Sequence, residues 1–367
     1  MSQHNTMMEE IEEQEGLLKE IFANREELTA DFVKVYRKRR FRKVIFVGNG
    51  SPYYAGYTLS FAAKKLLKAE AEAIPAGVFH NHGSFDASGN YEPSEILLVC
   101  PAESGHSRGQ VDAARRAKTA GICVMSTTLN PTGVLARESN IVLPKLGQHE
   151  VAMAATKGQT MALFMIFLNF LEAGYQAGNI TFAEYQEYLH GCEQLPINVG
   201  QTVVDTKAWF ENNYERIMAA NKFFLLGYGA NYGTVQEAAL KFFECHQKPT
   251  LALELEESLH GPFRALKPTD IVFFVMAEKG AERERMERLA RAVKSYCANC
   301  VMVTSNIQPV SGDVLTIHSS DIPFVNAVEY LIPFQVLSFL IAKNMGIDLS
   351  IPLVSALDEI MLPAYED

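Results

Sequence analysis

The chain has 367 residues, of which 48% are hydrophobic and 21% are charged, so it is long enough to form two hydrophobic cores and is expected to fold as two domains. Its formal net charge of -10 argues against a nucleic acid or an anionic membrane surface as a partner, because an acidic protein attracts neither. An anionic small ligand is compatible with this charge where backbone amides bind it.

Six cysteines lie mostly inside apolar stretches and lack the spacing of a small secreted domain, which favours a reducing, cytoplasmic setting. The lone pair Cys297 and Cys300 has no second pair to complete a zinc site, and His80 and His82 have no matching third ligand. We therefore expect a structural turn at the cysteines, loop positions for the two histidines and no metal. The longest apolar runs, MALFMIFLNFL and LIPFQVLSFLIA, are too short or too interrupted to cross a bilayer and predict buried helices.

The first predicted element is a helical segment from about residue 5 to 38. The sequence KVIFVGNGS then predicts a short strand, a glycine turn and a helix that begins near Pro52. The pattern continues with AEAIPAGVF, EILLVCPAESGHS, a helix in RGQVDAARRAKTAG, and strands in ICVMSTT and NIVLPKL. Strands that alternate with helices predict a parallel sheet with helices on both faces.

The same order of elements returns after two amphipathic helices that are predicted between about 153 and 215. KFFLLGYGANYGTVQEAALKFFE repeats the pattern of KVIFVGNGSPYYAGYTLSFAAKKL, and DIVFFVMAEKGAERERMERLARAV repeats that of EILLVCPAESGHSRGQVDAARRAK. The predicted fold class is therefore α/β, with two copies of one unit. The expected organisation is an N-terminal helical segment (1–40), a first domain (41–180), connecting helices (181–215), a second domain (216–345) and a C-terminal tail (346–367).

Two glycine-containing turns follow strands of the first copy, at Gly48-Asn49-Gly50-Ser51 and at Glu103-Ser104-Gly105-His106-Ser107. In an open parallel sheet, such turns present backbone N–H groups and a helix N-terminus to a phosphate. A dinucleotide fingerprint would require glycine where Tyr53 stands, and neither turn is followed by the Gly-Lys-Ser/Thr of a nucleotide-binding loop. The glycines could serve only tight turns, but two hydroxyl-bearing turns on adjacent strands favour phosphate binding.

At these residues the sequence resembles the double-SIS (sugar isomerase) family, which includes the isomerase half of glucosamine-6-phosphate synthase and the deglycases of phosphorylated fructosamines. GNGSPYYAG is similar to the family's C-G-T-S loop, ESGHS to S-x-S-G-E-T, and EVAMAATKGQT to E-x-G-V-A-S-T-K. QEAALKFFE is similar to E-G-A-L-K-x-x-E, and HGP to K-H-G-P. These segments occur in the family's order over nearly the whole chain, so the resemblance implies two tandem SIS domains.

The resemblance implies that serine hydroxyls and nearby backbone N–H groups bind the phosphate of a sugar phosphate. The residues it assigns to phosphate or substrate binding are Gly50, Ser51, Glu103, Ser104, Gly105, His106, Ser107, Glu150 and Ala155. Ala102 and Ala155 replace family serines, and His106 replaces a glutamate. The Glu103 carboxylate would need to point away from the phosphate or to pair with a cation, for which His106 and Arg108 are the candidates. Glu150 has an equally plausible role at the N-terminus of the helix that follows it.

Glu237, Lys241 and Glu244 have the spacing i, i+4 and i+7, which places them on one face of a helix. Apolar neighbours argue that this face is buried, although a solvated ladder of ion pairs is the alternative. The resemblance implies that Glu244 transfers a proton between C1 and C2 of the sugar, and that Lys241 orients or polarises the site. It also implies that His260 assists ring opening from the neighbouring subunit, so that the active form is at least a homodimer; a structural cap is the alternative for His260.

The tail and the N-terminal segment distinguish this chain from the synthase. No glutaminase domain precedes residue 40, and alignment on Gly346 and Pro352 puts Leu357 where the synthase has its Schiff-base lysine. These differences favour a deglycase that cleaves a 6-phosphofructosyl amine or amino acid to glucose 6-phosphate and the free amine, without a cofactor. The alternatives are an aldose–ketose sugar-phosphate isomerase, and a non-catalytic sugar-phosphate sensor that would not need Glu244 or His260.

Overall fold

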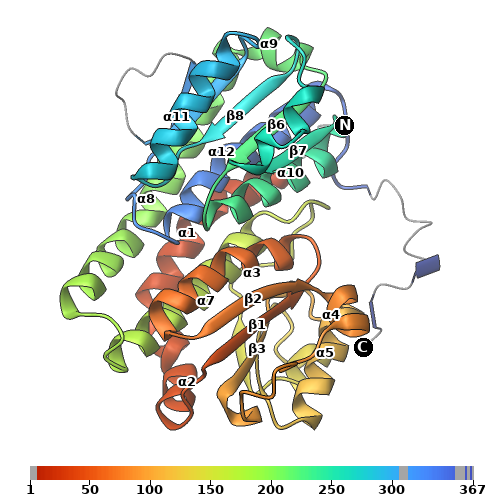
Figure 1. Cartoon of the computed structure of the whole chain (residues 1–367). Helices are drawn as coiled ribbons and strands as arrows, with labels where there is room; N and C mark the ends of the chain where they lie inside the picture. Colours follow the sequence, from red (N-terminus) through yellow and green to blue (C-terminus); the bar gives the residue numbers. More distant parts are fainter. Residues whose placement is uncertain (1–5, 306–312, 352–359, 362–363, 366–367) are drawn as a thin grey trace. The chain divides into compact units, whose positions relative to one another are not determined.

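The computed structural model describes residues 6–305, 313–351, 360–361 and 364–365. They form two compact units, each of which contains one parallel sheet of five strands (Figure 1). Of the described residues, the first-sheet unit comprises 16–150, 157–190, 360–361 and 364–365, and the second-sheet unit comprises 6–15, 151–156, 191–305 and 313–351. The predicted α/β fold class with two helix-flanked parallel sheets is confirmed.

The two sheets have the same topology. The strand order is β2-β1-β3-β4-β5 in the first sheet and, from the corresponding edge, β7-β6-β8-β9-β10 in the second. All pairings between these strands are parallel. The strands are β1 (Lys43–Gly48), β2 (Glu70–Pro75), β3 (Ile96–Cys100), β4 (Cys123–Thr128), β5 (Ile141–Pro144), β6 (Phe223–Gly227), β7 (Thr250–Glu254), β8 (Ile271–Val275), β9 (Cys300–Thr304) and β10 (Asp313–Thr316). The repeat in the sequence is thus a repeat of topology.

The α-helices alternate with these strands along the chain. They are α1 (Thr6–Ala23), α2 (Arg25–Lys38), α3 (Ser51–Ala62), α4 (Ala76–His82), α5 (Arg108–Thr119), α6 (Val134–Arg137), α7 (Lys157–Gln176), α8 (Phe182–Asn212), α9 (Tyr214–Ala219), α10 (Asn231–His246), α11 (Ala281–Lys294) and α12 (Asn326–Asn344). In the described part of the chain, no helix has both the length and the apolar character that a membrane crossing requires.

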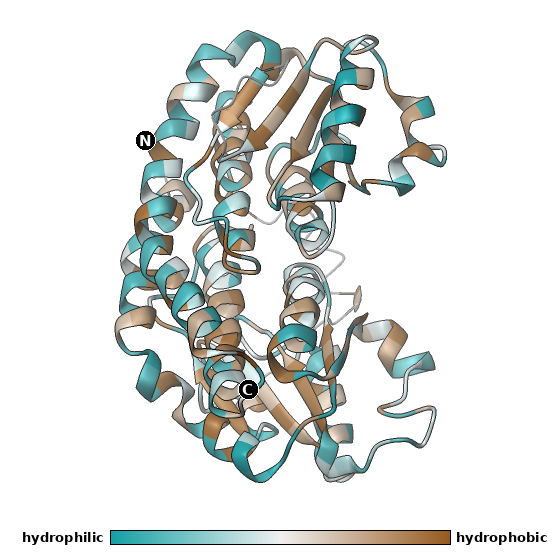
Figure 2. Ribbon diagram, turned by 60° about the vertical axis from the view of Figure 1, so that its left-hand side comes forward, coloured by the Kyte–Doolittle hydropathy of each residue, from teal (hydrophilic) through white to brown (hydrophobic). Residues whose placement is uncertain are grey.

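Helices cover both faces of the first sheet. On one face α4 and α5 pack against Ile45, Val47 and Leu98 of β1 and β3. On the other face α3 and α7 pack on the sheet, where the ring centroids of Phe46 and Phe170 are 6.2 Å apart. Because both faces are covered, the inner strands β1 and β3 are largely apolar and buried, and brown strands are visible in Figure 2.

The second sheet is covered in the same way. On one face, α10 and α12 pack against the sheet through an aromatic group in which Phe242 and Phe334 contact Phe273 edge to face. On the other face, Met286 of α11 belongs to a cluster with Phe224 of β6. The position of α10 in this unit is therefore fixed by a buried apolar face, which bears on the charged residues that the helix carries.

Three local predictions differ from the structure. The helix predicted over 5–38 is interrupted at Asn24, which has non-helical dihedral angles (φ -99°, ψ 13°) and separates α1 from α2. The helix α7 is not amphipathic, because α2 and α3 cover its outer faces and every residue from Lys157 to Gly174 is buried. His80 and His82 were predicted in a loop but lie in the last turn of α4, which begins directly after Pro75 ends β2.

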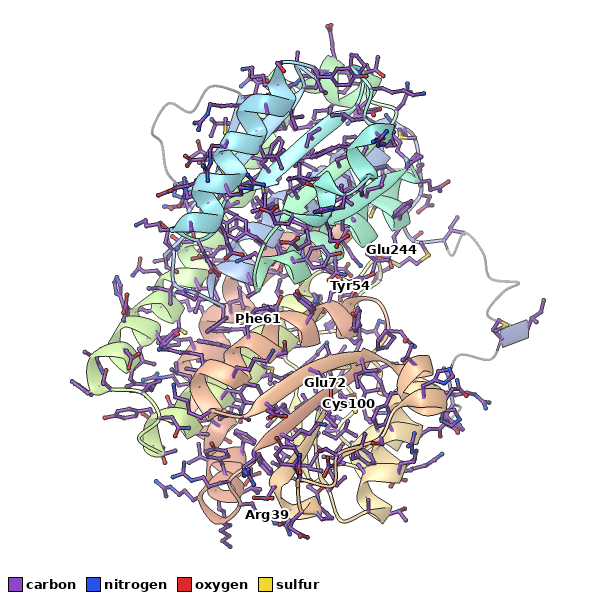
Figure 3. All side chains as sticks on the ribbon, viewed as in Figure 1. Arg39, Tyr54, Phe61, Glu72, Cys100 and Glu244 are labelled. Carbon is purple, nitrogen blue, oxygen red and sulfur yellow. The ribbon has the colours of Figure 1, made fainter. Side chains whose placement is uncertain are left out.

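The cysteines are all buried free thiols. Burial raises the pKa of Cys100, which lies at the end of β3 (Figure 3), to about 12. In the turn before β9 the Cys300 thiol donates a hydrogen bond to the Cys297 carbonyl oxygen (3.1 Å), and burial raises the pKa of both thiols. Among the described residues, no three His, Cys, Asp or Glu side chains are grouped so that they could hold a metal ion.

The buried ring of His246 predicts a pH dependence of stability. His246 packs between Phe223 and Phe242, and burial together with the Lys248 charge lowers its pKa from 6.5 to about 3. The unfolded imidazole therefore takes up a proton near pH 6.5 while the folded one does not, so stability is lost as the pH falls from 6.5 towards 3. The loss approaches about 1.4 kcal/mol per pH unit, and His246→Phe is expected to remove it from the free energies of unfolding measured in urea at pH 7 and pH 5. An unchanged pH dependence in the variant would contradict this assignment.

Candidate functional site

The two glycine-containing turns lie side by side at the carboxyl edge of the first sheet. They follow β1 and β3, which are directly paired. From β1 the chain continues to β2 on one side, whereas from β3 it continues to β4 on the other, so the strand order reverses between these two strands. Open parallel sheets bind ligands at such a switch point. The predicted adjacency of the two turns is confirmed.

Both turns depend on glycine. Gly50 has φ 59° and Gly105 has φ 77°, in the left-handed region that favours glycine. A Cβ on Gly105 would also lie 2.8 Å from the Thr128 hydroxyl oxygen. After these glycines, α3 begins at Ser51 and α5 follows Ser107, so each turn leads into the N-terminus of a twelve-residue helix. Free N–H groups at helix N-termini attract anions.

Hydroxyl groups accompany both turns. Ser51 and Ser104 are half-buried, and Ser107 is exposed. The Ser104 hydroxyl oxygen accepts a hydrogen bond from the His106 N–H (3.3 Å), which shapes the turn and leaves the hydroxyl proton available to a ligand. Ser51 and Ser104 thus belong to two neighbouring turns, as a phosphate site requires.

Gln110 connects the two turns and was missed in the sequence analysis. Its side chain is buried, and its Nε2 donates to the carbonyl oxygens of Val47, in β1, and Pro101, directly after β3. Asn49 connects the first turn to the start of α4, since its Oδ1 accepts the Ala76 N–H at 3.0 Å. A glutamine one helical turn after a glycine turn has no distinctive sequence pattern, so only the structure identifies this role.

Replacing Gln110 by leucine is expected to weaken sugar-phosphate binding by about tenfold, because two buried carbonyl oxygens lose their donor and the turns lose their connection. Calorimetric titration with sorbitol 6-phosphate measures the change, with Gln186→Leu on the exposed surface of α8 as the matched control. A folded Gln110 variant with unchanged affinity would exclude this role.

The cation paired with Glu103 is Lys145, and the prediction that His106 or Arg108 has this role was wrong. Lys145 Nζ forms an ion pair with Glu103 Oε2, and the lysine side chain is 2% exposed. The Arg108 guanidinium instead donates to the Ala364 carbonyl oxygen (3.3 Å) and stacks on Tyr365. Lys145 directly follows β5, so a cation far away in the sequence reaches the turn after β3.

The end of the described chain contacts the same turn. The Tyr365 N–H donates to the His106 carbonyl oxygen (2.8 Å), and Ala364 forms a β-bridge with Ser107. The Tyr365 hydroxyl donates to Asp112 of α5 (2.8 Å). Residues 364–365 are therefore held on the turn that carries Ser104 and Ser107.

Glu150 lies at the N-terminus of α7. Its two carboxylate oxygens accept the N–H groups of Lys157 (3.0 Å) and Gly158 (3.1 Å). These contacts favour the helix-capping interpretation over substrate contact. Ala155, in the bend that precedes α7, is half-buried and offers no side-chain donor.

The charged row of α10 is largely buried. Glu237 is 1% exposed and Lys241 is 0% exposed. Lys241 Nζ lies 3.4 Å from Glu237 Oε1 and also forms an ion pair with Glu244. Burial disfavours the ammonium, but the negative charges of Glu237 and Glu244 outweigh it and raise the pKa of Lys241. Because Glu237 and Lys241 are buried, the solvated ion-pair ladder was the wrong alternative, and only the Glu244 side chain, which is 29% exposed, is partly accessible. Lys241 is therefore expected to stay protonated, and it pairs with the more accessible carboxylate of Glu244, which is labelled in Figure 3.

His260 has an exposed side chain. It follows a single turn of 3₁₀-helix (Glu257–Leu259) after β7, and its N–H donates to the Glu257 carbonyl oxygen (3.0 Å). The backbone of His260 thus ends this turn, whereas its imidazole forms no hydrogen bond within the described part of the chain. No hydrogen bond or ion pair joins His260 to Glu244 among the described residues of one chain.

The switch point of the second sheet has different chemistry. The turns after β6 and β8 carry Ala230 and Lys279 at the positions of Ser51 and Ser104, whereas Glu278 corresponds to Glu103. Burial and the neighbouring charge of Glu282 raise the pKa of Glu278. Among the described residues, the turns of the second sheet therefore lack the two serine hydroxyls that the first sheet offers to a phosphate.

Comparison with known proteins relates the whole chain to one group of enzymes. No protein-family model matches the sequence. The chain is 23% identical over 355 residues to glutamine–fructose-6-phosphate aminotransferase [isomerizing] of Bradyrhizobium diazoefficiens, a match that covers 94% of this chain and 57% of that protein. This chain therefore corresponds to little more than half the length of that relative.

Two solved structures resemble it over nearly the whole chain. The C-terminal domain of glucosamine-fructose-6-phosphate aminotransferase from Francisella tularensis has a TM-score of 0.84 and 19% identity, covering 95% of this chain and 98% of that one. Glucosamine-6-phosphate deaminase from Thermotoga maritima has a TM-score of 0.74 and 25% identity, covering 95% and 97%.

The repeated sheet topology and the match to the Francisella structure show that the chain has the fold of two tandem SIS domains. In sequence it is similar to the glutamine–fructose-6-phosphate aminotransferases, of which it spans little more than half the length.

Proposed function

We propose that the chain is a sugar-phosphate enzyme in which the first-sheet turns bind the phosphate and α10 supplies the acid–base chemistry. The observation that carries this proposal is the pair of serine-bearing turns, held together by Gln110, at the switch point of the first sheet. The Lys241–Glu244 pair supports a catalytic role rather than binding alone, because burying a lysine between carboxylates is costly and has no part in phosphate binding.

Sugar-phosphate binding is tested by calorimetry with sorbitol 6-phosphate, sorbitol and inorganic phosphate. Sorbitol 6-phosphate is expected to bind more tightly than either fragment, and Gly105→Val is expected to abolish binding because its Cβ would clash with Thr128. Equal binding of sorbitol and its phosphate would exclude the phosphate site.

The specific reaction we propose is the deglycation of a 6-phosphofructosyl amine or amino acid. His260 assists ring opening, and Glu244 removes a proton from C1 and returns one to C2. The substrate nitrogen then forms an imine with C1, and water hydrolyses it to glucose 6-phosphate and the free amine. In favour of this reaction, the sequence has leucine at the Schiff-base position, Leu357, which lies outside the described residues.

The second candidate is an aldose–ketose isomerase. It would use Glu244 and His260 in the same way on a ketose phosphate without nitrogen. The word "isomerizing" in the name of the Bradyrhizobium relative favours this candidate. Conversion of fructose 6-phosphate without release of an amine from any phosphofructosyl compound would establish it over the deglycase.

We further propose that the protein is a homodimer whose subunits exchange His260. The exposed His260 imidazole forms no hydrogen bond within the described part of its own chain, and two exposed apolar side chains belong to elements that contact β7. Leu259 is 44% exposed beside it, and Phe243, next to Glu244 on α10, is 48% exposed. An exposed apolar surface beside the edge strand β7 suits a subunit interface.

Mixing of inactive variants tests the exchange. Glu244→Gln and His260→Ala subunits are each expected to be inactive, whereas randomly mixed dimers regain about one quarter of the wild-type activity, because half of the dimers contain one intact site. Mixed dimers that stay inactive would place both residues in sites of a single chain.

A further inference from the structure

We propose that Lys145 is a positioning residue for the phosphate: it acts through Glu103 and cancels the negative charge that this sequence places in the phosphate-binding turn. The inference rests on the proposed function, because it concerns the same turn. Lys145 belongs to none of the segments that resemble the family, and only the fold connects it to the site.

Lys145 is rigidly held beside the turn. Its backbone N–H donates to the Thr128 carbonyl oxygen (3.0 Å), and its buried Nζ pairs with Glu103 Oε2. The Glu103 backbone is fixed to the same place, since its carbonyl oxygen accepts the Leu129 N–H (2.9 Å) and the Thr128 hydroxyl (3.3 Å). The ends of β4 and β5 therefore fix the positions of both charges relative to Ser104, the next residue of the turn.

Water can replace Lys145 as the counter-charge only in part, because the Glu103 side chain is 25% exposed. Glu103 Oε1 is shielded from solvent and accepts no hydrogen bond within the described structure. The second carboxylate nearby, that of Glu150, is compensated separately by the N–H groups at the start of α7. A Cβ on Gly158 would clash with both carboxylates, which shows how close together they lie. Without Lys145, a negative charge that water screens only in part would remain beside the turn.

The consequence for the ligand depends on the ligand's charge. A phosphate monoester is mostly a dianion at pH 7.5 and becomes a monoanion below about pH 6. An uncompensated Glu103 carboxylate repels each negative charge of the ligand. It should therefore weaken the binding of a dianion more than the binding of a monoanion. If the role of Lys145 were purely structural, its loss would weaken the binding of both ligands equally.

The test compares Lys145→Met, Glu103→Gln and the double variant by calorimetry with sorbitol 6-phosphate and sorbitol 6-sulfate at pH 7.5. Lys145→Met is expected to weaken phosphate binding by roughly tenfold to a hundredfold and sulfate binding by about the square root of that factor. Glu103→Gln, which leaves the lysine charge in excess, is expected to tighten phosphate binding. The double variant is expected to bind like the wild type.

Two results would overturn the inference. If Lys145→Met loses the same factor of affinity for sorbitol 6-phosphate and for sorbitol 6-sulfate, and the double variant does not recover it, Lys145 has a structural role only. Unchanged binding in all variants would show that the pair does not affect the ligand. If Lys145→Met does not fold, the other two variants still test the inference. Glu103→Gln must bind sorbitol 6-phosphate more tightly than the wild type, and this gain must disappear in the double variant. Failure of the wild type to bind sorbitol 6-phosphate would instead contradict the proposed function itself.

Discussion

Glu244→Gln is expected to lower kcat for a phosphorylated sugar substrate by about a hundredfold to ten-thousandfold, with little change in the affinity for sorbitol 6-phosphate. The amide keeps the size of the side chain and can still accept a hydrogen bond from Lys241, but it cannot take up a proton from C1. Steady-state kinetics and calorimetry on the same preparation separate the loss of turnover from any loss of binding.

The matched control for this variant is Glu284→Gln, an exposed carboxylate on α11 of the same unit. It should leave both kcat and binding unchanged. Full turnover in the Glu244 variant would mean that another group transfers the proton and would remove α10 from the mechanism.

Lys241→Met is expected to destabilise the protein by about 3–5 kcal/mol, because the buried Glu237 carboxylate loses its ammonium partner and a buried charge without its partner is costly. The raised pKa of Lys241 has the same origin, since both neighbouring carboxylates favour the charged amine. Urea titration at neutral pH, followed by circular dichroism, measures the change in the free energy of unfolding.

The double variant Glu237→Gln with Lys241→Met separates charge from packing. It should recover a large part of the lost stability, because the amide needs no counter-charge. A single Lys241 variant that loses less than about 1 kcal/mol would show that this row is solvated in solution, like an ordinary surface ion pair.

The features that could be predicted from the sequence are those with short-range patterns. The glycines and serines of the two turns follow apolar strands within a few residues, and the rules for parallel sheets are enough to place these turns at one edge. The burial of Glu237 and Lys241 could be predicted because their apolar neighbours on α10 repeat with helical period. The two-sheet fold follows from the repeated order of the same signals.

The features that could not be predicted depend on contacts between distant segments. Lys145 meets Glu103 only because β5 lies two strands from β3, and Gln110 reaches the carbonyl oxygen of Val47 across the switch point. The contact of Tyr365 with the turn after β3 spans most of the chain. In each case the side chain is of an ordinary type, and its role is set by strand order rather than by neighbours in the sequence.

The most direct test of the proposed reaction is the release of glucose 6-phosphate and free amine from a panel of 6-phosphofructosyl amino acids, with both products quantified in each reaction. Our account predicts that the two products appear in equal amounts, that the rates rank the amines, and that both products disappear with Glu244→Gln. Binding of these compounds without release of either product, or formation of a ketose or aldose phosphate without amine, would contradict the deglycase.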